Sequence, residues 1–477
     1  MQLHTDGLVL RDAHGRHRVL HGINMVAKGV PGASNPGDFV GSWAREDIAD
    51  LAARGFTVVR LGMIWAAVEP EPGQYSQPYL DWLGEQLDLF HEFGIAVILD
   101  AHQDLYSQEF GDGAPSWATL TDEPFVPTDL WSDAYLTSPA VHTALDAFWA
   151  NAPGPTGIGL QESFAAMWAH VAATFRNHAA VVGYDLLNEP TPGSASGEIF
   201  QHLIGAFAQE TGQDPGQVAA DFMDPRAKLN QLARLDDVAV HQAVGDAVAP
   251  LLADFETTAV APMLDKVAAA IRAVDPDTLL LREHSYFANL GIPSGQPAMQ
   301  DHAWVYSPHG YDLTVDTDAI ADSSNIRAGT IFSRHADTQR RLGVPVVVGE
   351  WGAFGQADDV GQHATFLLDT FDVHGWSWTY WCWEDGFADT EAAAAMARPR
   401  PLAFAGDGLS WSVDGDRFSA VWDGRGCAEP SEFWVPNAVQ AEVAVQCNGV
   451  GVALERVGDR IRVEAVPGRC SLLATWR

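Results

Sequence analysis

Basic residues are scarce in this chain of 477 residues. Lysine and arginine together number 27, against 63 aspartate and glutamate residues, and the formal net charge is -36. Lysine occurs only at Lys28, Lys228 and Lys266. A surface this acidic repels nucleic-acid phosphates and anionic lipid headgroups. We therefore expect no nucleic-acid partner, and we interpret the excess negative charge as a solvated coat that aids solubility.

Long apolar runs are also missing from the sequence. None approaches the roughly 20 residues that a transmembrane helix needs, so we expect no stable insertion into a membrane. The first residues, Met1 to Asp6, are mostly polar and lack the basic start and apolar core of a secretory signal. Two expectations for localisation stay open: the protein is cytoplasmic, or it is secreted and a signal was removed before this sequence begins. We expect a monomer.

Cysteine is limited to four residues. Cys382 lies in a strand-like run, whereas Cys427, Cys447 and Cys470 lie near the C-terminus, where one pair could form a disulfide and one would be left over. The sequence alone does not distinguish the pairs. No Cys-x-x-Cys spacing and no Asp/Asn-rich loop suggests a metal centre, so we expect neither a metal nor another cofactor.

The sequence does contain a repeated alternation of short apolar runs and helical patterns. Runs this short and this aliphatic are typical of buried parallel strands. Eight of them precede residue 399, at 18–25, 57–62, 95–104, 181–190, 278–283, 304–311, 344–350 and 376–383. Strands that alternate with helices eight times predict an α/β fold, the (β/α)₈ TIM barrel.

Beyond residue 398 the pattern changes to short alternating strands separated by turns, as in 418–422, 441–445 and 460–463. This predicts a small antiparallel β domain, most simply a β-sandwich. We place a catalytic barrel at residues 1–398 and the β-sandwich at 399–477. Two large insertions interrupt the barrel, an aromatic-rich loop at 105–159 and a mostly helical segment at 191–258.

Two of the predicted strands end in a glutamate. Glu189 lies in Asn188-Glu189-Pro190, and Glu350 follows Val346-Val347-Val348-Gly349. The carboxyl ends of barrel strands face the active site. Two carboxylates there are the equipment of a glycoside hydrolase, which needs a nucleophile and an acid/base. We expect Glu350 to be the ionised nucleophile and Glu189 the acid/base, with a pKa raised by the neighbouring carboxylate.

Other polar and aromatic side chains near the strand ends are candidate substrate-binding residues. Arg60 lies inside a strand and needs a carboxylate partner; it would hold Glu350 ionised, or form a merely structural ion pair. Asn188 could hydrogen-bond the sugar 2-OH, and Tyr311 could hydrogen-bond the nucleophile. Trp383 could stack under the sugar, or pack in the barrel. The remaining candidates, which could bind sugar hydroxyls or support the pair, are Lys28, His102, Asp104 and His309.

At these residues the chain resembles glycoside hydrolase family 5, whose members are retaining enzymes on a TIM barrel. Arg60, His102, Asn188-Glu189-Pro190, His309-x-Tyr311, Glu350 and Trp383 fall where the family motif has that residue type. Within the family the chain is most similar to the endoglycoceramidases and glucosylceramidases. The specific signals are four segments: Trp65-Ala66-Ala67-Val68-Glu69-Pro70, Leu99-Asp100-Ala101-His102-Gln103-Asp104-Leu105-Tyr106-Ser107, Gly113-Ala114-Pro115-Ser116-Trp117-Ala118 and Tyr184-Asp185-Leu186-Leu187-Asn188-Glu189-Pro190.

The resemblance implies a β-glycoside substrate whose aglycone is a lipid such as ceramide, with Lys28 and Asp104 contacting the first sugars. The aromatic loop at 105–159 could line an apolar slot for that aglycone. Two alternatives stay open. One is a β-glucosidase for another aglycone, such as a steryl or plant glucoside. The other is a catalytically inactive barrel that binds carbohydrate, against which the two intact glutamates argue.

Overall fold

The computed structural model describes residues 1–33 and 35–476. At its centre eight parallel strands follow one another in the order β11-β13-β4-β5-β6-β7-β8-β9, and a parallel bridge between Tyr306 and Val346 closes the sheet into a barrel. The predicted TIM barrel is thereby confirmed. The barrel strands are β4 (His21–Val26), β5 (Val58–Ile64), β6 (Ala96–His102), β7 (Val181–Asp185), β8 (Leu279–Arg282), β9 (Trp304–Tyr306), β11 (Val347–Val348) and β13 (Ser377–Tyr380).

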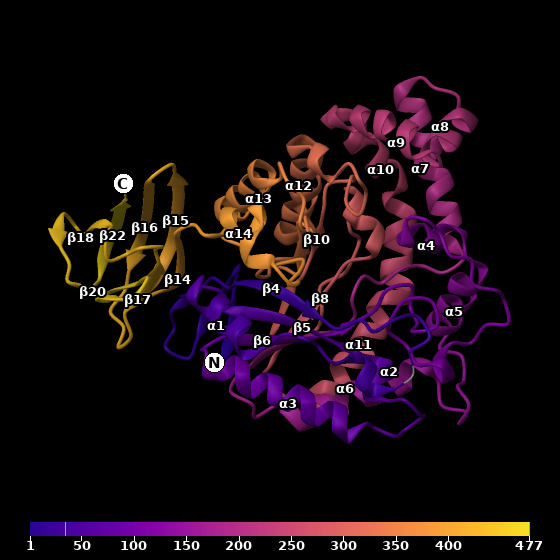
Figure 1. Ribbon diagram of the computed structural model, residues 1–477, viewed down its shortest axis with the longest axis horizontal. Coiled ribbons are helices and arrows are strands. Elements are labelled where there is room, and N and C mark those ends of the chain that lie inside the picture. Colours follow the sequence, from indigo (N-terminus) through magenta and orange to yellow (C-terminus); the bar gives the residue numbers. More distant parts are fainter. Residues whose placement is uncertain (34, 477) are drawn as a thin grey trace.

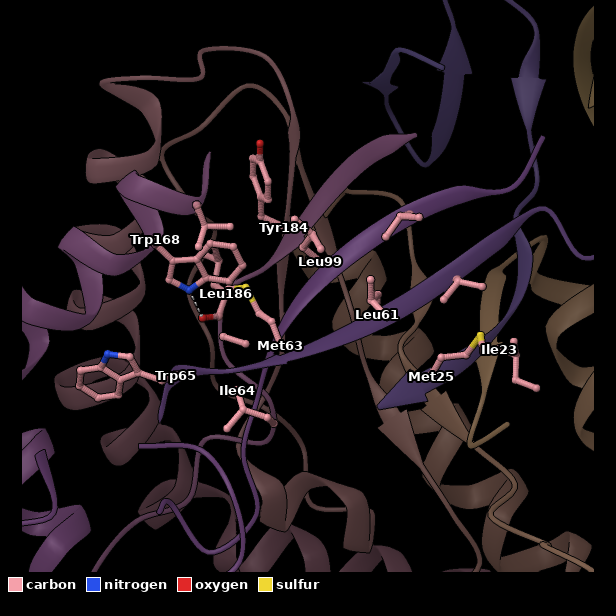
Figure 2. Packing of buried hydrophobic residues seen from close by; sticks show 14 of the residues in the cluster. Ile23, Met25, Leu61, Met63, Ile64, Trp65, Leu99, Trp168, Tyr184 and Leu186 are labelled. Atoms are coloured by element: carbon pink, nitrogen blue, oxygen red, sulfur yellow. Dashed lines mark hydrogen bonds between the residues drawn. The ribbon is translucent and has the colours of Figure 1, made fainter. Parts of the chain in front are cut away.

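Side chains alternate between the two faces of these strands. On β5, Leu61 and Met63 join the large core between the barrel and its helices, together with Leu99 of β6 and Tyr184 of β7; Figure 2 shows this packing, including the hydrogen bond from Trp168 Nε1 to the carbonyl of Leu186. Alternate residues therefore point into the barrel. An apolar cluster that includes Val58, Ile98, Leu279, Val305 and Val347 fills one part of the interior. The buried acids Asp100 and Asp185 lie near the C-terminal ends of β6 and β7.

The helices that surround the barrel begin and end at residues that favour helix termini. Helix α3 is capped by the Ser76 side chain, which accepts a hydrogen bond from the backbone of Tyr79, and α12 and α13 end at Gly343 and Gly375 in the left-handed conformation that glycine favours. The outer helices are α1 (Arg45–Ala53), α3 (Gln77–Glu92), α6 (Leu160–Phe175), α11 (Ala261–Arg272), α12 (Asn325–Leu342), α13 (Gly361–His374) and α14 (Glu391–Met396).

The second insertion is largely helical, whereas the first is mostly irregular and contains a few short helices. The first contains α4 (Ala134–Thr137) and α5 (Pro139–Trp149), and the second contains α7 (Ala195–Thr211), α8 (Pro215–Phe222), α9 (Pro225–Leu232) and α10 (Val238–Phe255). Asp214, Asp224 and Asp237 cap the last three of these helices with their carboxylates. Helices α7 to α10 stand together at one end of the molecule, opposite the C-terminal strands (Figure 1).

Helix α10 continues without a break through a π-helical turn into α11. The combined helix, Val238–Arg272, is 35 residues long, and its most apolar window has a mean hydropathy of 1.2. By length and composition alone this helix could cross a membrane, although Asp246, Asp254 and Glu256 interrupt its apolar residues. In the fold, however, its apolar residues pack against α7 at one end and α6 at the other. The absence of a stable membrane insertion stays a prediction.

The C-terminal strands form two sheets with a common apolar core that includes Phe418, Trp422 and Phe433. One sheet contains β15 (Gly406–Asp414), β16 (Arg417–Gly424), β18 (Glu442–Cys447), β19 (Val450–Gly451) and β22 (Gly468–Thr475); the other contains β14 (Arg400–Phe404), β17 (Ser431–Trp434), β20 (Leu454–Val457) and β21 (Arg460–Val463), extended by β1 (Leu3–Asp6), β2 (Val9–Asp12) and β3 (His17–Arg18). The predicted C-terminal antiparallel sheets are thereby confirmed. Since the N-terminal strands share a sheet with the C-terminal ones, the division at residue 398 stays a prediction.

Among the cysteines, Cys447 and Cys470 lie directly opposite each other on β18 and β22. Their Sγ atoms are 2.7 Å apart, whereas the thiol of Cys427 donates to the carbonyl of His14 at 3.4 Å. Side chains of directly opposed antiparallel residues can meet the narrow distance limits of a disulfide. Of the pairings that the sequence leaves open, Cys447 with Cys470 is the one for which the fold is arranged.

Candidate active site

A fully buried guanidinium lies at the centre of the polar end of the barrel. Arg60 has no exposed surface and contacts four carboxylates, those of Asp100, Asp185, Glu283 and Glu350, at 2.8–2.9 Å. It is on β5, and its inward position follows from the alternation that sends Leu61 outward. The predicted contact between Arg60 and Glu350 is present, but the same guanidinium also contacts three other acids, which share its single positive charge.

Glu350 is the first residue of β12 (Glu350–Trp351), a short strand that pairs with β10 (His309–Gly310). Arg60 Nη1 donates to its Oε1 at 2.8 Å, and the Tyr311 hydroxyl donates to its Oε2 at 2.6 Å. Both oxygens thus receive a hydrogen bond from a group that favours the carboxylate form. This environment suits a nucleophile.

Glu189 follows the end of β7, and its backbone is in the left-handed region, with φ of 43°. Non-glycine residues in such conformations cluster at functional sites because the surrounding structure must hold the strain. Its Oε1 receives hydrogen bonds from Asn289 Nδ2 at 2.7 Å and from His309 Nδ1 at 3.0 Å. Within the described residues no hydrogen bond reaches Oε2, which leaves that oxygen to carry a proton toward the substrate.

The two glutamates lie close to each other. One oxygen of Glu189, one of Glu350 and a ring nitrogen of His309 all lie within 4.8 Å of one another. Retaining glycoside hydrolases have carboxyl groups roughly 5–5.5 Å apart, whereas inverting enzymes have them roughly 6.5–9.5 Å apart to admit a water. The separation therefore favours a double displacement through a covalent glycosyl-enzyme.

The ionisation of the pair differs from the expectation. Burial raises the pKa of Glu350 to about 7, although His309 and Arg60 act in the opposite direction. Burial also acts to raise the pKa of Glu189, but the hydrogen bond and charge of His309, the hydrogen bond of Asn289 and the charge of His284 together outweigh it, and this pKa is lowered from its ordinary value. The predicted rise at Glu189 is therefore wrong for the free enzyme. Two acids this close titrate as a pair. At a pH between the two pKa values of the pair, the two carboxyl groups together hold a single proton.

We expect the reactive form to be the one in which this single proton is on Glu189. For an alkyl β-glycoside, kcat/KM should fall as the pH rises through about 7, because the pair then loses the proton that the leaving group needs. A 2,4-dinitrophenyl glycoside departs without protonation, so its kcat/KM should rise over the same range as Glu350 ionises. Profiles measured from about pH 5 to 9 test this. Parallel profiles for the two substrates would contradict it.

The cleft above the pair has a volume of about 810 Å³. Six of the predicted site residues line it: Lys28, His102, Asp104, Glu189, Tyr311 and Glu350. His102 Nδ1 lies 2.9 Å from Asp100, and Lys28 forms an ion pair with Asp104. Since Lys28 and Asp104 lie at the cleft surface, both remain available to sugar hydroxyls.

Arg60, Asn188 and His309 lie beneath the cleft. The Asn188 amide is held on both sides: its oxygen accepts from Arg60 Nη2 at 2.9 Å, and its nitrogen donates to the carbonyl of Gln103 at 3.0 Å. The pKa of His309 is raised well above its usual value, because Glu283, Glu350 and Glu189 outweigh the effect of burial. The protonated ring of His309 therefore lies between the carboxylates of Glu189, Glu283 and Glu350. The roles proposed for these residues stay predictions.

Trp383 is not among the residues that line the cleft. Its ring packs edge-on against Trp43, with ring centres 5.9 Å apart. Two other tryptophans, Trp131 and Trp381, line the cleft. Trp381 stacks on His102, with ring centres 5.2 Å apart, and lies 4.5 Å from Lys28 Nζ. The chain leaves β13 at Tyr380, so strand alternation no longer dictates which tryptophan faces the sugar. We move the proposed stacking platform to Trp381.

Several residues of the site were missed by sequence reasoning. Glu283 follows β8 just as Glu189 follows β7, and its Oε2 accepts a hydrogen bond from the backbone of Glu189 at 2.7 Å. The position at a strand end could have identified it. Asn24 donates to the carbonyl of Gly349, just before the nucleophile, at 2.9 Å. Asn289 comes from a short helix after β8, where no sequence pattern marks it.

Among the described residues, three groups of acids and histidines are close enough to hold a cation by distance alone: His102 with Asp104 and Asp112; Glu189 with His309 and Glu350; and Asp100 with Asp185 and Glu283. Each group already contacts a cation of the protein. Lys28 pairs with Asp104, and Arg60 contacts acids of the other two groups. The donor sets therefore do not call for a metal, whose predicted absence stays a prediction.

Comparisons with known proteins agree with this geometry. The cellulase (glycosyl hydrolase family 5) model matches residues 22–386. Endoglycoceramidase I of Rhodococcus hoagii is 26% identical over 480 residues, which cover 96% of this chain and 85% of that protein. The structure of endo-glycoceramidase II from Rhodococcus sp. in a ganglioside GM3 complex is 26% identical, with a TM-score of 0.76 over 99% of this chain and 100% of that one. The structure of the same enzyme has also been solved as a lactosyl-enzyme intermediate.

A crystal structure of an endogalactoceramidase is 25% identical, with a TM-score of 0.70 over 99% of each chain. The family model spans nearly the whole barrel, and the motif residues other than Trp383 converge at the end of the barrel where the strands finish. The chain therefore belongs to glycoside hydrolase family 5 and is a retaining glycoside hydrolase.

Proposed function

We propose that this enzyme cleaves the bond between a β-linked sugar or oligosaccharide and a lipid aglycone, ceramide in the first place. The observation that carries the proposal is an apolar groove of about 1260 Å³ that adjoins the catalytic cleft. The groove and the cleft share five lining residues: Tyr286, Leu290, Leu313, Val315 and Asp316. A substrate could therefore place its sugar over the glutamates and its apolar part in the groove.

The groove lies between the two insertions. The aromatic loop contributes Leu130, Tyr135 and Leu136, and helices α7 and α8 contribute among others Phe200 and Phe222. A mostly apolar, concave surface with a few polar groups at its edge suits a lipid chain rather than a second sugar. Two of the relatives are an endoglycoceramidase and an endogalactoceramidase, and their names describe enzymes that act on glycolipids.

In the proposed reaction, Glu350 attacks the anomeric carbon while Glu189 Oε2 gives its proton to the oxygen of the lipid. The lipid leaves as an alcohol, and the sugar is bound to Glu350 as an ester. Glu189, now ionised, takes a proton from a water that attacks the same carbon, which releases the sugar with its original anomeric configuration. Arg60 and Tyr311 hold Glu350 in position for attack.

The test is a set of glycolipids in detergent: glucosylceramide, lactosylceramide, a ganglioside and a steryl glucoside, with products identified by mass. Intact oligosaccharide together with ceramide would support endo action on glycolipids. Free glucose from glucosylceramide alone would restrict the proposal to a short sugar site. Cleavage of the steryl glucoside alone would replace ceramide by a sterol. Cleavage of aryl glycosides with none of these lipids would overturn the proposal.

A groove variant gives a sharper prediction. Phe200 is half-buried on α7 and lines the groove away from the glutamates. Phe200→Ser should lower kcat/KM on the preferred glycolipid about tenfold or more, because burying an aromatic ring contributes roughly 1.5–3 kcal/mol. Activity on a short aryl glycoside should hardly change. Val373→Ser, at a residue 82% exposed on α13, is the matched control. Equal loss on both substrates would contradict a lipid role for the groove.

The structure also separates two tryptophans of the aromatic loop. Trp117 packs edge-on against Trp65 and donates to the carbonyl of Glu69 at 3.1 Å, so its role is structural. Trp131 is more exposed, lines the cleft and donates to Asp316 at 3.0 Å. Trp117→Ala should therefore lower the melting temperature and reduce activity on aryl and lipid glycosides alike. Trp131→Ala should preserve the melting temperature and weaken substrate binding; the opposite ranking would contradict these assignments.

A further inference from the structure

A residue outside the predicted set, Asn289, contacts the acid/base directly. Asn289 is 7% exposed and belongs to the short helix η6 (Tyr286–Leu290). Its Nδ2 donates to Glu189 Oε1 at 2.7 Å, a shorter bond than the one from His309 to the same oxygen at 3.0 Å. A donor on Oε1 stabilises negative charge there, so the proton of the acid form is directed to Oε2.

The helix η6 is held in place at three points. The backbone of Tyr286 donates to the carbonyl of Pro190, next to the acid/base, at 3.0 Å. At its other end the carbonyl of Leu290 lies 2.9 Å from His241 Nε2 on α10. Before it, the backbone of Ser285 donates to the carboxylate of Glu256 at 2.9 Å. Each contact restricts where the Asn289 amide can lie.

Glu256 is a buried acid without a part in the reaction. It is the first residue of the π-helical turn (Glu256–Val260) that joins α10 to α11, and it has no exposed surface. Besides Ser285, its oxygens accept from the Ser294 hydroxyl at 3.0 Å and from the backbone of Gly295. A fully buried carboxylate needs this many donors. The π-turn therefore serves to aim Glu256 at the loops on both sides of η6.

We propose that Asn289 is a positioning residue for the acid/base, held in place by Glu256. It orients the Glu189 carboxyl so that Oε2 faces the departing oxygen, and its hydrogen bond keeps Oε1 as the acceptor. The effect falls on leaving-group protonation and spares the nucleophile, because Glu350 has its own donors in Arg60 and Tyr311. The inference concerns the family reaction and does not depend on the aglycone.

Other groups that face the acid/base also bear on its ionisation and must stay constant in any test. They come from several elements around it: His102, Tyr135, Glu283, His284, Tyr286, His309, Tyr311, Asp316 and Glu350. Asn289 is the uncharged donor on Glu189 Oε1, so its substitution by alanine changes the hydrogen bonding of Glu189 without adding a charge.

The experiment compares Asn289→Ala with the wild-type enzyme on the octyl and 2,4-dinitrophenyl β-glycosides of one sugar. We expect kcat/KM on the octyl glycoside to fall about 10- to 100-fold, since its alkoxide must be protonated as it leaves. On the dinitrophenyl glycoside the fall should be about threefold or less, because that leaving group needs no acid. The pH at which the octyl activity declines should move upward, since Glu189 loses a bond that favours its ionised form.

Two further variants keep the test decisive. Asn289→Asp keeps the size of the side chain but replaces the donor by an acceptor, so it should shift the pH profile further in the same direction. Glu256→Gln should repeat the Asn289→Ala pattern more weakly, because the loop is held by fewer charge-assisted bonds. Equal losses on both glycosides, or an unchanged pH profile in both Asn289 variants, would overturn the proposal. Since both substrates lack a ceramide, failure of the lipid assay would leave this result unaffected.

Discussion

Replacing Glu350 by glutamine is expected to lower kcat by roughly four orders of magnitude or more, because an amide cannot form the glycosyl ester on which the retaining mechanism depends. Glutamine keeps the shape of the side chain and an oxygen for Arg60 and Tyr311, which both donate to the carboxylate. Substrate binding should therefore persist. The two expectations are tested by measuring the residual kcat and the affinity for the sugar product on the same preparation.

The melting temperature serves as the control for this variant. Arg60 retains three carboxylate partners, Asp100, Asp185 and Glu283, when Glu350 becomes neutral. The fold should therefore remain intact. Turnover within about tenfold of wild type would contradict the nucleophile assignment. Loss of product binding together with a large fall in melting temperature would instead mark Glu350 as structural.

Replacing Arg60 by methionine is expected to have the largest effect on stability. The guanidinium is fully buried and contacts Asp100, Asp185, Glu283 and Glu350. Breaking a buried ion pair by removing one partner costs roughly 3–5 kcal/mol, and here one cation serves several acids. Arg54→Met, at a partly exposed arginine paired with Asp50, should change stability by roughly 0.5 kcal/mol or less.

The pH dependence of the Arg60 effect follows from linkage. Burial raises the pKa of Asp100 to about 6 and also raises the pKa of Glu283. The charge of Arg60 acts in the opposite direction on both acids. Without Arg60 these pKa values rise further above their unfolded values. The folded variant then binds more protons than the unfolded chain, so its stability falls as the pH rises above roughly 4. Denaturant unfolding at about pH 5 and 8 tests this. If the stability lost in Arg60→Met does not grow with pH, the result would contradict the view that the Arg60 charge stabilises several buried acids.

Much of the fold could be predicted because a barrel is built from local signals. Each buried parallel strand is a short aliphatic run, and a strand end is recognisable from the glycine or proline that follows, as after Glu189 and Glu350. Positions within a strand alternate faces, so Arg60 could be placed inside. The pairing of β3 with β14 joins residues far apart in the chain and leaves no local pattern.

The parts of the site that could not be predicted depend on contacts between strands or on loops. Which acids meet Arg60 depends on register: Asn24 and Ile98 lie beside it on β4 and β6, and Asp100 lies two residues further on. The choice between Trp381 and Trp383 depends on how the chain leaves β13. Asn289 is positioned by a helix from another part of the chain. Glu283 was predictable, since it occupies a strand end as Glu189 does.

The most direct test of the central claim, that Glu350 and Glu189 act as nucleophile and acid/base, is covalent trapping. A 2-deoxy-2-fluoro β-glycoside with a dinitrophenyl leaving group forms the glycosyl-enzyme quickly and releases it slowly, because fluorine destabilises the oxocarbenium-like transition state. Intact mass should increase by one fluorosugar per chain, and peptide mapping should place it on Glu350. Label on Glu189, Glu283 or any other carboxylate, or no label with continued hydrolysis, would contradict the account.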